Sequence, residues 1–130
     1  MSYQSALNTL QWSTHIEVDE PDGPTYFDGT NFEPSKELEE RIYNDWENFQ
    51  AQAIELGFDP EKHRITYINL SEGDYWDYAA HDFILTRNGH GAGFWDGDWS
   101  EPIATKLTEL CKKFGEIEIY LSDKNLLEAY

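Results

Sequence analysis

Apolar residues recur at helical spacing in two long segments of the chain. Intervals of three and four residues predict a helix over about residues 35–56, with Ser35 as its N-cap. The same spacing predicts a helix over about residues 101–114, with Pro102 in its first turn and Gly115 at its end. The two apolar stripes consist of Leu38, Ile42, Trp46, Phe49, Ala53, Leu56, Ile103, Leu107, Leu110, Cys111 and Phe114.

The N-terminal third has a weaker pattern. Tyr3, Leu7 and Leu10 lie at intervals of four and three, which predicts a short helix ending near Trp12. Residues 17–34 contain three prolines, two glycines and six acids, a composition that is typical of a long ordered loop.

Period-two alternation and turn residues predict β-structure in the C-terminal half. Residues 82–87 and 92–96 are predicted to form an antiparallel hairpin that turns at residues 88–91, because Asn-Gly tolerates the positive φ of a tight turn. Residues 116–121 alternate as a strand with Ile117, Ile119 and Leu121 facing inward.

The stretch between the first long helix and the hairpin gives two shorter predictions. Residues 63–70 (HRITYINL) are rich in β-branched and aromatic side chains and are predicted to form a strand. Residues 74–80 are predicted to form a helical turn.

These elements predict an α+β fold in one domain that spans residues 1–130. A small antiparallel sheet, made of the hairpin at about 82–96 and the strand at about 116–121, would be packed by the helices at about 35–56 and 101–114. A single cysteine, Cys111, excludes an internal disulfide and fits a reducing cytoplasm. It lies on an apolar stripe and is expected to be a buried, inert thiol.

The net charge restricts the partners that this fold can bind. The chain has 26 Asp and Glu against 9 Lys and Arg, a formal net charge of −17. Such a molecule is repelled by nucleic acid, anionic lipid and phosphate-rich substrates, and basic surfaces are its natural partners. No apolar run approaches the roughly 20 residues of a membrane span, and the first ten residues do not resemble a signal peptide.

The acidic residues are concentrated. Residues 17–47 hold eleven Asp and Glu against two Lys and Arg, so more than half of the net charge lies in under a quarter of the chain. A soluble domain needs a net charge of only about 2–8 in magnitude, and the excess predicts a surface that binds a basic partner. The residues proposed for that surface are Glu37, Glu40, Glu47, Asp19, Glu20 and Asp22.

The spacing of these acids can be compared with that of nucleic-acid phosphates. Six acids on about 27 Å of helix give one charge per about 4.5 Å. A single DNA strand has one per ~3.4 Å and a duplex one per ~1.7 Å. A duplex mimic would therefore need the acidic loop alongside the helix as a second row of charge.

The predicted hairpin is an alternative site. It gathers residues that could bind a metal or a ligand where the strand ends converge: His81, Asp82, Arg87, Asn88, His90, Asp96 and Asp98. The calcium-loop pattern fails because Glu101 stands where glycine is required. The glycines join two predicted strands, so they do not form a phosphate loop at a helix N-terminus. We therefore assign no metal and no cofactor, and no residue is assigned a catalytic role.

The segment HDFILTRNGHGAGFWD (residues 81–96) resembles a signature of small acidic proteins from phages and their bacterial hosts. The similarity extends over about residues 81–123. It implies a phage-type accessory protein in the cytoplasm of a bacterial host, and it transfers no catalytic residue because no activity is established for that family. In outline the chain is also similar to anti-restriction and anti-CRISPR proteins.

The sequence thus favours a non-enzymatic protein that binds a basic host protein surface, such as that of a nucleic-acid-binding protein, as a nucleic-acid mimic or anti-defence inhibitor. The alternative is a small metal-assisted hydrolase or ligand-binding protein that uses residues 81–98. A third hypothesis is a self-assembling protein, and the sequence alone does not set the oligomeric state.

Overall fold

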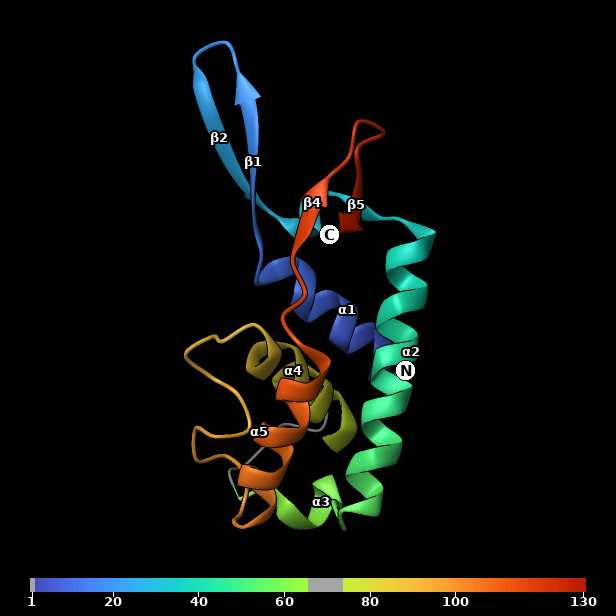
Figure 1. The fold of residues 1–130 in the computed structure, drawn as a ribbon. Helices are drawn as coiled ribbons and strands as arrows, with labels where there is room; N and C mark the ends of the chain where they lie inside the picture. The colour runs from blue at the N-terminus through green and yellow to red at the C-terminus, as the bar shows by residue number, and fades with distance from the viewer. Residues whose placement is uncertain (1, 66–73) are drawn as a thin grey trace.

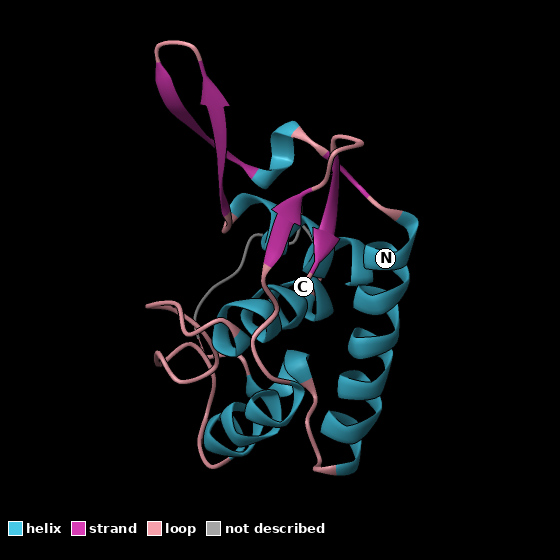
Figure 2. Ribbon diagram, turned by 45° about the horizontal axis from the view of Figure 1, so that its top comes forward, coloured by secondary structure: helices cyan, strands magenta, loops and turns pink. Residues whose placement is uncertain are grey.

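The computed structural model describes residues 2–65 and 74–130 and has an α+β fold (Figures 1 and 2). Its helices are α1 (Ser2–Trp12), α2 (Lys36–Glu55), α3 (Pro60–His63), α4 (Tyr75–Arg87) and α5 (Ile103–Phe114), with the short 3-10 helix η1 (Gly29–Asn31). Its strands are β1 (His15–Glu20), β2 (Gly23–Asp28), β3 (Glu33–Pro34), β4 (Ile119–Leu121) and β5 (Leu126–Ala129). The predicted fold class is confirmed, although the strands that build the sheets differ from those expected.

Both long amphipathic helices are confirmed. Ser35 caps α2 by accepting a hydrogen bond from the Leu38 amide at 3.1 Å, and every apolar residue of the stripe from Leu38 to Ala53 is buried. Gly115 ends α5 with a φ of 75°, where the absence of a Cβ avoids strain. The predicted N-terminal helix is also confirmed as α1, which buries Leu7 and Leu10.

Residues 82–96 do not form the predicted hairpin. Residues 75–87 are helix α4, and residues 88–99 return along it as a loop. The Asn-Gly pair ends the helix: the amide of Gly89 bonds the carbonyl of Thr86 at 3.3 Å, and that of His90 bonds the carbonyl of Leu85 at 3.0 Å. This is a Schellman C-cap, which uses the positive φ of Gly89 (67°) as a tight hairpin turn would.

The alternation in residues 82–87 is misleading because α4 is buried almost all round. Ala79, Ala80, Phe83, Ile84 and Leu85 are all buried, so the apolar residues of the helix do not form a single stripe that reveals its period. Figure 1 shows α4 in the middle of the helical layer, between α1 and α5. The predicted helical turn at 74–80 is the first part of this helix, with Asp74 as its N-cap.

The acidic segment 17–34, predicted to be a loop, is largely β-structure. β1 and β2 form an antiparallel hairpin whose register pairs His15 with Asp28 and Glu20 with Gly23. The alternation of Ile16 and Val18 directs one face toward the core, and Pro24 is tolerated because β2 is an edge strand. The hairpin projects away from the helices, as Figures 1 and 2 show.

A second sheet has the strand order β3-β5-β4, with β3 parallel to β5 and β4 antiparallel to it. The predicted strand at 116–121 is confirmed over its last three residues, and Ile117 and Ile119 are buried as expected. β5 was not predicted. The predicted strand at 63–70 lies outside the described residues from position 66 onward; before that, residues 60–63 are helical and Arg64 pairs with Trp99 in an isolated β-bridge.

One aromatic core joins these layers. Phe49 of α2 stacks on Phe83 of α4 with ring centroids 4.5 Å apart, and Phe94 also stacks on Phe49, at 5.7 Å. Trp46 and Trp99 extend the cluster and are also buried. Loop 88–99 therefore contributes Phe94 and Trp99 to the core, while Trp95 and Asp96 between them are exposed.

Candidate functional site

The seven residues of the predicted hairpin site are separated in the structure. His81 and Asp82 lie in the middle of α4, while Arg87 and Asn88 lie at its C-terminal end. Asp96 and Asp98 are in the loop that returns along α4, and His90 is at the start of that loop. The expected convergence across strand ends was wrong because the segment is helical, but His81, Asp82 and Asp98 do join one polar cluster.

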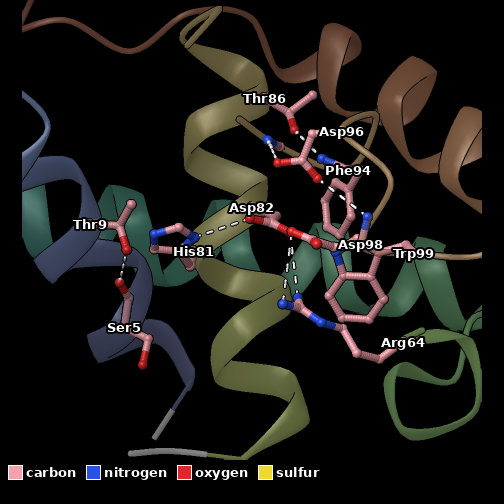
Figure 3. Close-up of polar contacts among 11 residues, drawn as sticks. Ser5, Thr9, Arg64, His81, Asp82, Thr86, Phe94, Asp96, Asp98 and Trp99 are labelled. Atoms are coloured by element: carbon pink, nitrogen blue, oxygen red, sulfur yellow. Dashed lines mark hydrogen bonds and ion pairs between the residues drawn. The ribbon is translucent and has the colours of Figure 1, made fainter. Parts of the chain in front are cut away.

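Asp82 is the centre of this cluster, and it is only 4% exposed (Figure 3). Its carboxylate accepts a hydrogen bond from Trp99 Nε1 at 2.6 Å and lies 3.0 Å from His81 Nδ1. Arg64 Nη1 is 3.9 Å from the same carboxylate. A buried carboxylate is stable only when it is paired in this way.

Arg64 is held by aromatic rings as well as by acids. Its guanidinium lies 5.1 Å from the ring centroid of Tyr78 and 4.9 Å from that of Trp99. Its Nη2 is 3.9 Å from Asp98. Burial, and then the negative charge of Asp96, raise the pKa of Asp98, while Arg64 opposes this rise.

Asp82 orients the imidazole ring of His81 through the contact at Nδ1. An ionised carboxylate can only accept a hydrogen bond, so Nδ1 of His81 is the donor in this contact, and Nε2 is the ring nitrogen that faces away from Asp82. Figure 3 shows the ring between α4 and α1, with its second nitrogen on the side of Ser5 and Thr9. Trp12 covers the ring, with centroids 5.5 Å apart, and is itself 46% exposed.

His81 lines a hollow between α1 and α4 that the sequence did not predict. The hollow has a volume of about 280 Å³, and its lining residues are Ser5, Asn8, Thr9, Asp77, Tyr78 and His81. The Ser5 hydroxyl donates to Asp77 at 2.7 Å, and the Thr9 hydroxyl donates to the Ser5 carbonyl at 2.7 Å. Ser5 and Thr9 are one helical turn apart in the sequence, as are Asp77 and His81, and this spacing is a signal of shared polar faces.

Arg87 and Asn88 fasten the end of α4 to the chain that follows α5. The Arg87 guanidinium donates to the carbonyls of Gly115 (2.8 Å) and Phe114 (3.2 Å) and to Asp45 (3.0 Å). Burial lowers the pKa of Arg87, and the charge of Asp45 opposes that shift. The side-chain amide of Asn88 both donates to and accepts from the backbone of Ile117, at 3.1 and 2.8 Å. The polar groups of both side chains are thus used in hydrogen bonds that stabilise the fold.

The loop after α4 is held by short polar contacts. The Thr86 hydroxyl accepts a hydrogen bond from the Phe94 amide at 3.0 Å, which seats Phe94 in the core. Asp96 accepts from the amides of Gly93 (3.3 Å) and Asp98 (3.4 Å). The glycine-rich signature thus encodes a close approach of the loop to α4.

Gly93 gives a direct test of that close approach. A Cβ at this position would overlap Thr86 Oγ1, whereas a Cβ at Gly91 would meet nothing within 4 Å. We expect Gly93→Ala to lower the free energy of unfolding by about 1–3 kcal/mol. Gly91→Ala should change it by about 0.5 kcal/mol or less. Urea unfolding of the two variants side by side checks this, and equal stabilities would contradict the loop packing.

Among the described residues, no group of three or more His, Cys, Asp or Glu side chains is placed to share a metal ion. The metal-assisted alternative therefore has no ligand set within residues 2–65 and 74–130. Cys111 is buried in α5 as expected, and burial raises the pKa of its thiol, so it remains protonated and unreactive.

The six residues proposed for partner binding lie on two separate elements. Glu37, Glu40 and Glu47 are exposed along α2, and Glu20 and Asp22 are exposed at the tip of the β1–β2 hairpin. Asp19 lies in β1 opposite Pro24. Figures 1 and 2 show the hairpin and α2 on different sides of the molecule, so they do not form the two parallel rows of charge that a duplex mimic needs.

Comparison of the chain with protein-family models, with curated proteins and with solved structures finds no match. The resemblance to phage-type proteins over about residues 81–123 stays a prediction from the sequence. In the part of the chain that the structure describes, none of the helices is both long and apolar enough to span a bilayer.

Proposed function

We propose that this protein is a non-enzymatic acidic binding protein that docks on a basic protein surface. The observation that carries the proposal is the β1–β2 hairpin. Residues 15–28 hold five Asp and Glu and no Lys or Arg, and they project from the body of the molecule. A two-stranded hairpin has little stability of its own, so an exposed one with a single sign of charge is well suited to contact a partner.

The exposed acids of α2 form a second acidic surface, separate from the hairpin and on another side of the molecule. Electrostatic steering by such a surface speeds the encounter with a basic partner and weakens as salt is added. The 81–96 signature, together with the charge, supports a phage-type accessory protein in a bacterial cytoplasm. A nucleic-acid-binding host protein has the basic groove that this charge fits, so the protein would act as an anti-defence inhibitor.

The test is a pull-down from bacterial lysate in which the position of the charge is varied and its amount is held constant. One variant carries Glu37→Gln, Glu40→Gln and Glu47→Gln, and a second carries Glu17→Gln, Glu20→Gln and Asp22→Asn. The control carries Glu61→Gln, Glu116→Gln and Asp123→Asn, which are also exposed acids and raise the net charge equally.

We expect the parent and the control to retain the same salt-sensitive partner. Each surface variant should retain it less, with association about tenfold slower once that partner is purified. His90→Ala should bind as the parent does. If the control loses the partner as much as the surface variants do, only total charge matters and the proposed surface is wrong.

A further inference from the structure

The hollow between α1 and α4 offers several hydrogen-bond acceptors, and the side-chain amide of Asn8, whose Oδ1 already accepts from Gln4, adds donors at its edge. The protons of three lining groups are already used within the protein: Ser5 Oγ donates to Asp77, Thr9 Oγ1 to the Ser5 carbonyl, and His81 Nδ1 to Asp82. What these groups present to the hollow is therefore their lone pairs.

The charge of the hollow also favours a ligand that donates hydrogen bonds. Asp77 is a carboxylate with about four acceptor positions, of which the Ser5 hydroxyl and the Asp74 amide occupy two. Among the residues that the structure describes, those that line the hollow include no Lys or Arg. A ligand that fits must donate several hydrogen bonds and carry a positive charge.

Aromatic rings beside the acceptors favour a planar group. His81 and Tyr78 both line the hollow, and the indole of Trp12 lies against the far part of the His81 ring, with centroids 5.5 Å apart and planes tilted by 31°. A volume of about 280 Å³ is small for a cofactor site and sufficient for one side-chain head group. A guanidinium is planar, stacks on aromatic rings and spreads five N–H donors, whereas an ammonium concentrates three at one point.

We propose that this hollow binds the guanidinium group of an arginine side chain. His81 Nε2 and the Asp77 carboxylate accept its N–H donors, and Asp82 acts as a positioning residue that holds Nδ1 of the ring and leaves Nε2 as the nitrogen available to the ligand. The guanidinium can come from free arginine or from a protein chain. The described lining residues include no cation that could pair with the α-carboxylate of free arginine, so we infer that the ligand is an arginine side chain of another protein. This choice of ligand rests on the proposed function.

The test uses the intact protein and three probes: Nα-acetyl-arginine methylamide, free L-arginine and Nα-acetyl-lysine methylamide. Titration is followed by NMR through the Trp12 indole N–H and the ring protons of His81. We expect saturable shifts with the blocked arginine, and binding at least about fivefold weaker for the other two probes. Equal binding of blocked lysine, or no saturable shift with blocked arginine, would overturn the proposal.

Two variants separate this site from general attraction to an acidic protein. His81→Phe preserves the net charge and a ring beside Trp12 but removes the acceptor. Asp77→Asn removes one charge from the hollow, and its control is Asp123→Asn, which removes one from a distant exposed turn. Binding should weaken about tenfold in the first two and stay unchanged in the control. Equal weakening by Asp77→Asn and Asp123→Asn would contradict a specific site.

Blocked arginine binds without any partner, so the outcome is independent of the pull-down. If the hollow binds arginine while the acidic surface variants retain the partner fully, the proposed function fails and the site stands. If the surface variants lose the partner while blocked arginine gives no shifts, the site fails alone.

Discussion

Replacing Arg87 with alanine is expected to lower the free energy of unfolding by about 3–5 kcal/mol. The side chain of Arg87 is completely buried. Without its guanidinium, the carbonyls of Phe114 and Gly115 lose their side-chain donor, and a void opens where the guanidinium lies against Phe83 and Phe114. Urea unfolding followed by tryptophan fluorescence measures the loss.

Arg41 is a matched control because it contacts the same acid. Its Nε lies 4.0 Å from Asp45, but its side chain is 41% exposed, so Arg41→Ala should cost no more than about 1 kcal/mol. Arg87→Met, which keeps most of the volume, should lie between the two. If Arg87→Ala costs no more than Arg41→Ala, the fastening of α4 to α5 is not what stabilises this fold.

Asp82→Ala is expected to be about as costly, also about 3–5 kcal/mol. It removes the buried acid that pairs with Arg64, whose side chain is only 10% exposed, and it removes the acceptor of Trp99 Nε1. Asp82→Asn should cost less, since the amide oxygen can still accept from the indole. Besides the urea midpoint, the Trp99 indole N–H resonance should move upfield in the alanine variant as its hydrogen bond is lost.

Asp98 provides the control for this second prediction. It lies at the same 3.9 Å from Arg64, but burial and Asp96 raise the pKa of Asp98. A raised pKa means that folding favours the protonated form, so the ionised carboxylate costs stability at neutral pH and the cost is relieved as the pH falls. Asp98→Asn should therefore leave stability at pH 7 unchanged or slightly higher. A loss as large as that of Asp82→Ala would contradict the assignment of Asp82 as the main partner.

The elements that could be predicted from the sequence are those with one polar face. Helices α2 and α5 each bury one stripe and expose the other side, so their period is visible in the residues. Helix α4 could not be predicted in this way, because Ala79, Ile84 and Leu85 point to different neighbours and all are buried. Asn-Gly then favoured a hairpin turn, although the same positive φ serves a helix C-cap.

The acidic hairpin was missed for a different reason. Ile16 and Val18 alternate on β1, but Pro21 and Pro24 and the density of acids are typical of loops. The two strands meet across a short turn and leave Pro24 on an edge strand, where its missing N–H costs nothing.

The candidate site was predicted only in part. His81 and Asp82 were singled out as functional, but Arg64 and Trp99, which hold Asp82, are 18 and 17 positions away and belong to other segments. Arg87 and Asn88 were grouped with them on the assumption of a hairpin. Their partners at residues 114–117 show a structural role that no spacing within the motif could reveal.

The side-chain amide of Asn88 has the same donor and acceptor groups as a backbone peptide unit. It gives Ile117 the donor and the acceptor that a neighbouring strand would give, two residues before β4 begins. Asn88, at the end of α4, thus takes the place of one residue of a neighbouring strand. Its two hydrogen bonds connect the helical layer to the segment that leads into β4. Aspartate would offer two acceptors and no donor to the Ile117 carbonyl, and glutamine would be one methylene too long. Chemistry therefore restricts this position to asparagine more tightly than packing does.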